Sequence, residues 1–302
     1  MTLVATLIAA DGALDTDSAE RARALLPGAG AVQWLAAATA ADIPFSAEGA
    51  ADGSAAARLA LTERLRAALV ATDVVVQPAA ERRKRLFLAD MDSTMIRQEC
   101  IDELADFVGV KEHVAGITER AMRGEIAFEP ALRERVALLK GLPGTIADDV
   151  IRDRIRLTDG ARTLIATMRR HGTYTCLVTG GFTLFSDRLA PAIGFDEARA
   201  NRLLLDAEGK LAGTVAEPIF GKSAKLATLI ELRGRLGLGK AETMATGDGA
   251  NDMEMIGEAG LGVAFHAKPK VAAAAPARID HGDLTALLYV QGYRKAEFVT
   301  AL

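Results

Sequence analysis

The stretch of sequence that decides the fold is LFLADMDST at residues 86–94, a short apolar run that leads into two closely spaced aspartates. Charged residues flank the apolar run on both sides, a pattern typical of a strand buried inside a parallel sheet. A second acidic loop, GDGAND at residues 247–252, follows another predicted strand at 242–245. Open α/β sheets bind ligands just beyond the carboxyl ends of their strands, where both loops lie. The two loops are therefore the first candidates for a functional site.

Strand and helix signals alternate along the chain, which predicts an α/β fold with a doubly wound parallel sheet. Residues 1–80 are expected to form a small α/β unit that ends at the charged linker 81–85. Helical spacing of apolar residues predicts an insertion of about four helices at 98–158, so that the core comprises 81–97 and 159–302. In detail, we expect strands at 3–8, 32–35, 73–76, 173–178, 242–245 and 260–265, helices at 55–70 and 222–234, a turn at 180–181 and a hairpin at 203–215.

Composition and charge argue against several classes of function. The 302 residues carry a formal net charge of −4, and the isoelectric point is about 5.7. Nucleic acid or an anionic membrane would select a basic stripe, and the one basic run, 82–85, is too short to provide it. Proline and glycine interrupt the longest uncharged run, 24–41, so no membrane span is expected. Cys100 and Cys176 lie far apart in the sequence, which argues against a disulfide framework and fits a cytoplasmic location.

Carboxylates gathered in two loops predict a bound cation. Like charges a few ångströms apart repel one another, so they need either a shared proton or a positive ion between them. Mg²⁺ suits this position, since it binds carboxylate oxygens, keeps several waters and contacts substrate phosphates. The competing interpretation is that the aspartates only cap helices and form turns. One such loop would be ordinary, but two in one α/β chain favour the metal site.

Several motifs in a fixed order identify a family resemblance. DxDxT at 90–94, TGG at 179–181, a later lysine and GDGxND at 247–252 resemble the haloacid dehalogenase superfamily of aspartyl-phosphate phosphotransferases. A finer resemblance, to the phosphoserine phosphatase family, comes from ECIDELA at 99–105, FEPALRERV at 128–136 and AKPK at 267–270. It covers about residues 86–292, and the motifs are specific only in combination. It implies a Rossmann-like core with a helical cap and the Mg²⁺-dependent hydrolysis of O-phosphoserine, the last step of serine biosynthesis.

The resemblance implies roles for the four aspartates. Asp90 is expected to be the nucleophile that forms an aspartyl-phosphate intermediate. Asp92 is expected to protonate the leaving serine oxygen and then to take a proton from the attacking water. Neighbouring anions raise the pKa of such a carboxyl, as proton donation requires. Asp248 is expected to bind Mg²⁺ together with the Asp90 carboxylate and the Asp92 backbone carbonyl, and Asp252 to support these ligands.

The resemblance also implies which residues surround the phosphate. Thr179 is expected to bond a phosphate oxygen through its hydroxyl, helped by the backbone N–H groups of Gly180 and Gly181. Many phosphoserine phosphatases have serine at this position, and threonine keeps the hydroxyl. Lys222 is expected to neutralise charge on the nucleophile and the phosphate, although a single helix lysine is ordinarily exposed to solvent. Asn251 is expected to contact both substrate and phosphate.

Recognition of the serine part is expected in the helical insertion, which acts as a cap over the site in this family. Glu99 matches the position for the substrate ammonium and Arg135 the position for its carboxylate. Without the resemblance, surface salt bridges would be the better interpretation of both. Met122 and Phe128 are candidates for the apolar part of the pocket, with ordinary core packing as the alternative.

Other functions stay open at this stage. The same acids serve a phosphotransferase that moves phosphate from phosphoserine to homoserine, or a phosphatase for another small phosphate. A non-catalytic amino-acid sensor is a third reading, which the intact acidic residues disfavour. The N-terminal unit resembles the ACT amino-acid-binding module, and a dimerising or regulatory role is a hypothesis for it. The expected partners are a small-molecule substrate and a second copy of the chain, with neither nucleic acid nor membrane.

Overall fold

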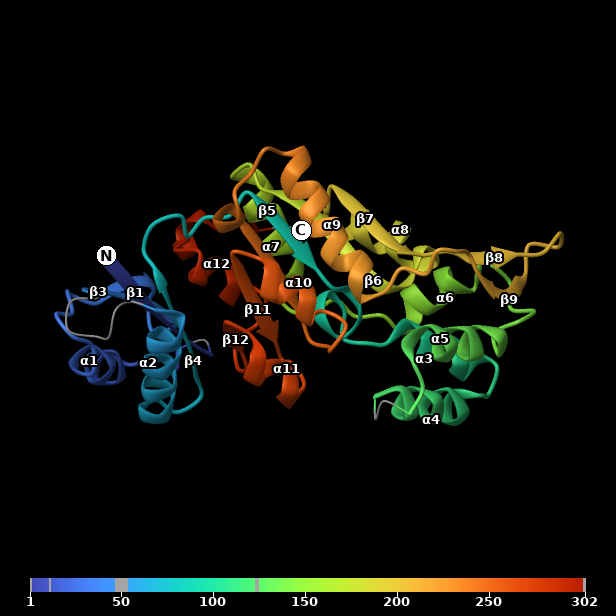
Figure 1. Cartoon of the computed structure of the whole chain (residues 1–302). Helices are drawn as coiled ribbons and strands as arrows, with labels where there is room; N and C mark the ends of the chain where they lie inside the picture. The colour runs from blue at the N-terminus through green and yellow to red at the C-terminus, as the bar shows by residue number, and fades with distance from the viewer. Residues whose placement is uncertain (1, 11, 47–53, 123–124, 301–302) are drawn as a thin grey trace.

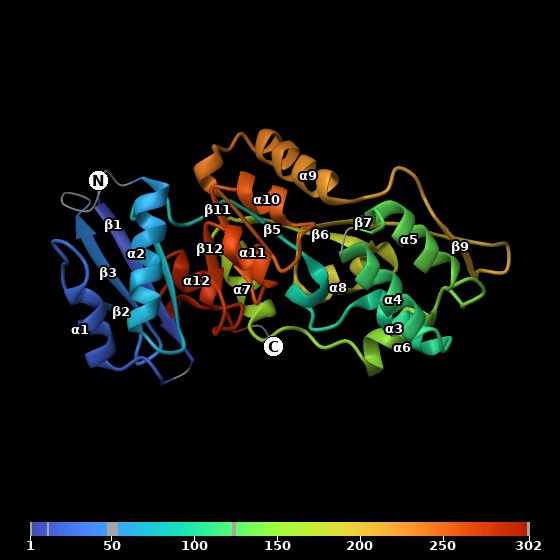
Figure 2. The ribbon, with the colours of Figure 1, turned by 60° about the horizontal axis from the view of Figure 1, so that its bottom comes forward.

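The computed structural model describes residues 2–10, 12–46, 54–122 and 125–300. Three parts follow one another along an elongated molecule, as Figure 1 and Figure 2 show. The N-terminal unit lies at one end, the helical insertion lies at the other, and a parallel sheet with its helices lies between them. Within the described residues, none of the helices has the length and apolar character that a bilayer span requires.

The N-terminal unit is an antiparallel sheet of four strands in the order β2-β3-β1-β4. The strands are β1 (Thr2–Ala9), β2 (Gln33–Ala36), β3 (Ala40–Ser46) and β4 (Thr72–Pro78), and the helices are α1 (Thr16–Ala24) and α2 (Ala55–Ala68). Alternate residues of β1, among them Leu3 and Leu7, share a buried cluster with Leu61 and Leu65 of α2. The three predicted strands and the predicted helix are present, whereas β3 was not predicted. The resemblance to the ACT module stays a prediction.

The central sheet has six strands in the order β12-β11-β10-β5-β6-β7, and every neighbouring pair is parallel. Its strands are β5 (Leu86–Ala89), β6 (Tyr174–Phe182), β7 (Glu197–Asn201), β10 (Thr243–Gly247), β11 (Leu261–Phe265) and β12 (Ala277–Ile279). The predicted α/β class and parallel sheet are confirmed. The predicted turn at 180–181 is wrong, because β6 continues through these glycines to its end, with a register shift against β7.

Helices cover both faces of this sheet, and β5 shows why. Leu86 and Leu88 pack on one face with residues of α9 and α10, while Phe87 and Ala89 pack on the other with residues of α7 and α8. The helices are α7 (Ala161–Arg170), α8 (Thr183–Ile193), α9 (Lys222–Arg235), α10 (Met253–Glu258), α11 (Pro269–Ala274) and α12 (Ala286–Val290). A strand that is buried on both faces must be apolar throughout, which is the pattern that the sequence shows at 86–89.

The described residues of the insertion form four helices, as predicted. They are α3 (Cys100–Phe107), α4 (Lys111–Met122), α5 (Phe128–Ala137) and α6 (Ile146–Asp153). The predicted hairpin is also present, as β8 (Leu203–Leu205) and β9 (Leu211–Val215). Its strand β9 contacts α5. Backbone hydrogen bonds also join Leu211 to Gly141 and Leu142, in the segment after α5. The hairpin, counted with the core in the predicted division, thus packs against the helical insertion.

Candidate active site

Asp90 lies immediately beyond the carboxyl end of β5, where the neighbouring strand β10 holds the chain. Its backbone N–H donates to the carbonyl of Thr246 at a distance of 3.0 Å. The Asp90 side chain is buried, and its Oδ1 accepts hydrogen bonds from the Met91 N–H and the Lys225 ammonium, at 2.8 and 2.7 Å. Neither bond involves Oδ2, so this oxygen is left for chemistry. The chain then turns through Met91–Met95, where Asp92 is extended and Ser93 has a positive φ of 55°.

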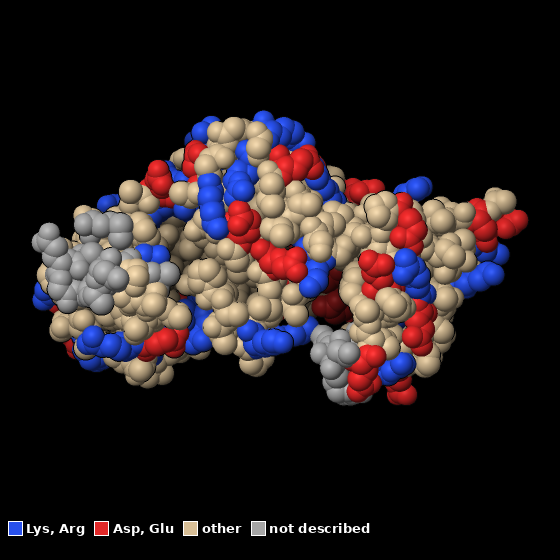
Figure 3. Space-filling model, viewed as in Figure 1, with Lys and Arg blue, Asp and Glu red and all other residues tan. Residues whose placement is uncertain are grey.

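The second acidic loop meets the first at the same edge of the sheet. One carboxylate oxygen from each of Asp90, Asp248 and Asp252 lies within 4.8 Å of the others, and all three residues are buried. Gly247 makes this approach feasible, because a Cβ there would lie 2.3 Å from Cγ of Asp252. Figure 3 shows acidic atoms set back in a hollow between the core and the helical insertion. The two loops that the sequence singled out therefore form one site.

Lys225, rather than Lys222, is the lysine of this site. Its Nζ lies 2.7 Å from carboxylate oxygens of both Asp90 and Asp252, and its side chain is fully buried. Lys222 begins the same helix but has 63% of its side chain exposed and pairs with Glu254 at 3.0 Å. The prediction for Lys222 is wrong because successive positions at the start of α9 face different sides, and Lys222 faces solvent.

Helical spacing within α9 contained the signal for Lys225. Residues 225, 229 and 232 stand four and three positions apart, and the structure buries Leu229 and Leu232 with Lys225. A lysine at the head of such an apolar stripe has to enter the core, which lysines do only when they find a partner. The neighbouring carboxylates also determine whether Lys225 is charged. Burial alone would lower the pKa of Lys225, but the charges of Asp252 and Asp90 more than reverse this and raise it.

Asp92 faces a different set of partners from Asp90. Its Oδ1 accepts from the backbone N–H of Cys100 at 3.0 Å, and its Oδ2 accepts from the Thr179 hydroxyl at 3.2 Å. Burial and the nearby charge of Glu99 raise the pKa of Asp92 to about 7. A carboxyl with this pKa holds or releases a proton near neutral pH, as an acid–base residue must.

The residues predicted around the phosphate also lie at this edge. The Thr179 hydroxyl accepts from the Gly181 N–H at 2.9 Å while donating to Asp92. Gly181 has no room for a side chain, since a Cβ would lie 2.7 Å from Oδ2 of Asp92. The carbonyl of Gly180 accepts from the side-chain amide of Asn201 at 2.9 Å. Sequence reasoning missed Asn201, which also binds the backbone of the loop before α9.

Asn251 lies close to the turn of the second acidic loop. A Cβ on Gly249 would lie 2.3 Å from its Oδ1, so the amide folds back over that glycine. The Gly249 N–H donates to Oδ2 of Asp252 at 3.1 Å. Asp252 therefore bonds both Lys225 and the loop backbone, which fits the predicted supporting position behind the metal ligands.

Among the residues that the structure describes, neither Glu99 nor Arg135 forms the surface salt bridge of the alternative interpretation. Glu99 precedes α3 and accepts from the Ser93 hydroxyl at 2.7 Å. Arg135 is half-buried on α5 and donates to the Thr118 hydroxyl at 3.2 Å and to a backbone carbonyl. Among the described residues, no carboxylate forms a salt bridge with Arg135. Burial lowers the pKa of Arg135, and the charges of Asp102 and Glu99 act against that effect.

Phe128 links the insertion to the core beside the site. It is the first residue of α5, and its ring lies over two core glycines, 3.4 to 3.5 Å from where Cβ atoms on Gly180 and Gly221 would stand. The residue remains 37% exposed, which fits an apolar wall at the entrance better than ordinary core packing. Met122 is the last residue of α4, and its side chain lies outside the described part of the structure.

The donor set at the acidic edge fits a hard divalent cation. Three buried carboxylates face one ammonium, so the cluster carries excess negative charge when all four groups are ionised. Burial and Asp252 raise the pKa of both Asp90 and Asp248, that of Asp248 to about 6. A cation with oxygen ligands would relieve this repulsion and hold the acids ionised. The residues present therefore suit a metal ion, and the cluster by itself does not specify which one.

Comparisons with known proteins agree with this geometry. The family model described as haloacid dehalogenase-like hydrolase matches residues 87–256. A phosphoserine phosphatase of Polaromonas sp. is 46% identical over 209 residues, which cover 68% of this chain and 88% of that protein. The chain spans between 56% and 63% of the length of three longer phosphoserine phosphatases with 41% to 43% identity.

Solved structures extend the similarity beyond the core. A haloacid dehalogenase family hydrolase from Salmonella enterica serovar Typhi is 27% identical, covers 96% of this chain and 98% of its own, and superposes with a TM-score of 0.82. A phospho-aspartyl intermediate analogue of phosphoserine phosphatase is 40% identical, covers 68% of this chain and 98% of its own, and has a TM-score of 0.63. The Salmonella match includes the N-terminal unit, because it covers nearly the whole chain.

Proposed function

The chain belongs to the haloacid dehalogenase-like hydrolase family, among its phosphoserine phosphatases, and we propose on this premise that it hydrolyses O-phosphoserine with Asp90 as nucleophile and Mg²⁺ as cofactor. The observation that carries the proposal is the meeting of Asp90, Asp248 and Asp252 within 4.8 Å, with the Lys225 ammonium 2.7 Å from two of them. With a divalent cation bound, such a site would neutralise a phosphoryl group in transfer, which is the main task of a protein in this chemistry.

In the first step, Oδ2 of Asp90 attacks the phosphorus atom and the bond from phosphorus to the serine oxygen breaks. The Asp92 carboxyl donates its proton to that oxygen, so that serine leaves as the neutral alcohol. The pKa of about 7 supports this role, because an ordinary aspartate would already be ionised. Met91 and Lys225 meanwhile hold Oδ1, which orients the attacking oxygen.

In the second step, a water attacks the phosphorus of the aspartyl-phosphate and gives its proton to the Asp92 carboxylate. The bond between phosphorus and the Asp90 oxygen breaks, which releases inorganic phosphate and restores the Asp90 carboxylate. Asp92 ends the cycle protonated, as it began. The Thr179 hydroxyl, 3.2 Å from Asp92, keeps that side chain in place and lies where a phosphate oxygen can reach it.

Mg²⁺ is expected to bind the carboxylates of Asp90 and Asp248 and the backbone carbonyl of Asp92, with Asp252 behind them. It supplies positive charge against the phosphate oxygens and the developing charge of the reaction. Lys225 adds a second positive charge, since its ammonium 2.7 Å from Asp90 stabilises that carboxylate in its ionised, nucleophilic form. The chain thus brings two kinds of positive charge to one phosphate.

Substrate choice is proposed to lie with Arg135 and Glu99. Arg135 is a half-buried guanidinium whose described partners are a hydroxyl and a carbonyl, and a substrate carboxylate would complete its bonding. Glu99 provides a negative charge on the same side for the substrate ammonium. Phe128 closes the apolar side of the entrance. A cytoplasmic location and a homodimer stay predictions.

The proposal is tested by measuring phosphate release, with Mg²⁺, from O-phosphoserine and from O-phosphoethanolamine, which lacks the carboxylate. We expect Arg135→Ala to lower kcat/KM for phosphoserine by about 30-fold or more and to change turnover of phosphoethanolamine little. Arg133→Ala is the matched control, since Arg133 is exposed on the same helix and pairs with Glu217 at 2.6 Å. Equal losses of kcat/KM for both substrates would mean that Arg135 does not recognise the substrate carboxylate. Phosphohomoserine formed with added homoserine would instead assign a phosphotransferase.

A further inference from the structure

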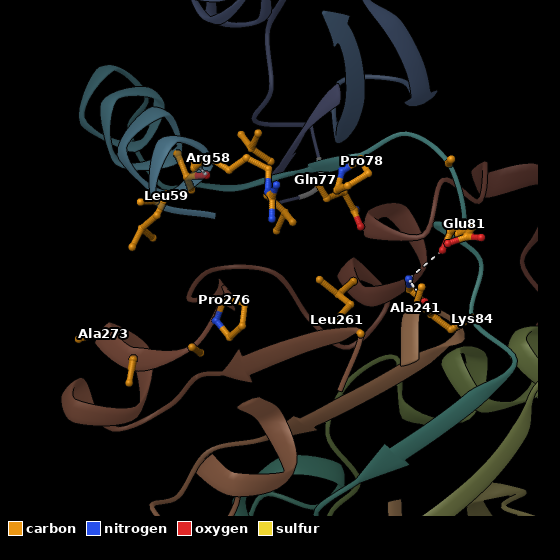
Figure 4. A pocket seen from close by; sticks show the side chains of 18 residues that line it. Arg58, Leu59, Gln77, Pro78, Glu81, Lys84, Ala241, Leu261, Ala273 and Pro276 are labelled. Carbon is orange, nitrogen blue, oxygen red and sulfur yellow. Dashed lines mark hydrogen bonds between the residues drawn. The ribbon is translucent and has the colours of Figure 1, made fainter. Parts of the chain in front are cut away.

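A second cavity lies at the opposite end of the central sheet from the acidic site. It has a volume of about 390 Å³, within the range of small-molecule pockets. Its walls come from two parts of the chain. Figure 4 shows α2 and the end of β4 on one side, with Arg58 and Leu59, and the core on the other, with Leu261, Ala273 and Pro276. We call this space the interdomain cleft.

Lys84 forms one end of the interdomain cleft. It lies two residues before β5, is 7% exposed and donates from Nζ to the carbonyls of Glu81 and Ala241 at 2.8 and 2.6 Å. An ammonium has three N–H donors, so one remains. Among the described residues, no carboxylate forms a salt bridge with Lys84. The carboxylates of Glu81 and Glu242 act on this ammonium only from a distance. A buried ammonium without an anion bonded to it is costly, and a ligand anion would complete its bonding.

The two walls of the interdomain cleft are fixed relative to one another. The Arg82 guanidinium bonds Asp42 of the N-terminal sheet at 2.7 Å and the carbonyl of Val290 in the core at 3.0 Å. The carboxylate of Asp73 accepts from the backbone N–H groups of Asp280 and Gly282, both at 2.7 Å. The cleft is thus a built cavity between docked parts rather than a gap between loose ones.

We propose that the interdomain cleft binds a small aliphatic carboxylate, whose anionic end bonds the Lys84 ammonium and whose apolar end lies against Leu59, Leu261 and the alanines of α11. One remaining donor suits a single carboxylate oxygen better than a phosphate dianion, which needs several donors. The lining supports the apolar end, because most of the residues beyond Lys84 are aliphatic. Arg58, on the far wall, adds positive potential, and the Glu81 carboxylate beside Lys84 acts against it.

The test measures binding of hexanoate to the full-length chain by isothermal titration or ligand-observed NMR, with hexanamide as the uncharged analogue. We expect saturable binding of hexanoate and at least about tenfold weaker binding of hexanamide. Binding should also raise the melting temperature with increasing hexanoate, since a ligand of the folded state stabilises it. Equal binding of the two probes, or no saturable binding of hexanoate, overturns the proposal.

Two substitutions from opposite walls localise the binding. Lys84→Met keeps the length of the side chain without its charge, and Leu59→Glu places a negative charge on the apolar wall, at a residue that is 45% exposed. Each should weaken hexanoate binding at least about tenfold. Ala67→Glu is the matched control for the second, because Ala67 is exposed on the same helix and lies outside the cleft. Unchanged affinity in both cleft variants overturns the proposal. The readout is binding rather than turnover, so its failure is separate from failure of the phosphatase assignment.

Discussion

The two ends of β5 carry two buried lysine ammonium groups in opposite electrostatic situations. Lys225 reaches the carboxyl end and lies between two carboxylates, which raise its pKa despite complete burial. Lys84 stands at the amino end between two backbone carbonyls, and burial lowers its pKa to about 8. Both side chains are buried, but their partners differ: Lys225 contacts two carboxylates directly, whereas Glu81 and Glu242 act on Lys84 only from a distance. Carboxylates in direct contact hold a buried ammonium in its charged form, whereas peptide dipoles and more distant carboxylates do not.

The largest expected effect at either end of β5 comes from removing the nucleophile at the carboxyl end. We expect Asp90→Asn to lower phosphate release by at least about a thousandfold, because the amide oxygen cannot form the phosphorylated intermediate. The variant should still fold, since asparagine is nearly isosteric with aspartate and removes one buried negative charge. Steady-state phosphate assays and circular dichroism give the two readouts. Turnover near that of the original protein would contradict the proposed chemistry.

Removing the lysine from the carboxyl end is expected to have the next largest effect. Lys225→Met leaves two buried carboxylates without their shared cation, and breaking such a pair costs about 3–5 kcal/mol of stability. Lys222→Met is the matched control on the same helix, and its exposed pair should contribute no more than about 1 kcal/mol. Urea unfolding of both variants measures the difference. Similar losses of stability in the two variants would mean that Lys222 stabilises the fold as much as Lys225 does.

At the amino end, the expected signature is a dependence of stability on pH. The pKa of Lys84 is about 8 in the folded chain and 10.5 in the unfolded reference, so the unfolded state binds more protons between these values. Stability contributed by this residue therefore rises as pH increases from 8 to 10.5, by at most about 3 kcal/mol. Urea unfolding across this range should show the rise in the original protein relative to Lys84→Met. Parallel curves for the two proteins would mean that Lys84 is not a buried, unpaired charge.

The smallest expected effect concerns the protonation of Asp92. Because its pKa is raised to about 7, the proton-donating form is lost as pH rises above that value. At saturating phosphoserine, the rate of phosphoenzyme formation should then fall about tenfold per pH unit. Rapid-quench measurements from pH 6 to 9 test this, and Asp92→Asn should lack this pH-dependent fall. A flat profile in the original protein would assign the acid role elsewhere.

Much of the fold and part of the site were predictable from the sequence for a local reason. Asp90 and Asp248 each follow a short apolar run directly, and a strand buried on both faces fixes where its next residue emerges. The strand at 86–89 and the helical insertion were found in the same way. The prediction of Lys222 was wrong because the family motif requires a lysine but does not say which face of the helix carries it. In the structure, the lysine that reaches the site is at position 225.

The sequence by itself determined the α/β class, the two acidic loops, the family and the insertion between the core segments, because each depends on residues close together in the chain. Only the tertiary structure decided which carboxylates Lys225 pairs with, that β6 continues through Gly180 and Gly181, and that an interdomain cleft opens beside Lys84. These features depend on packing between segments far apart in sequence. No local pattern carries that information, since burial and pairing are set by what the rest of the fold brings near.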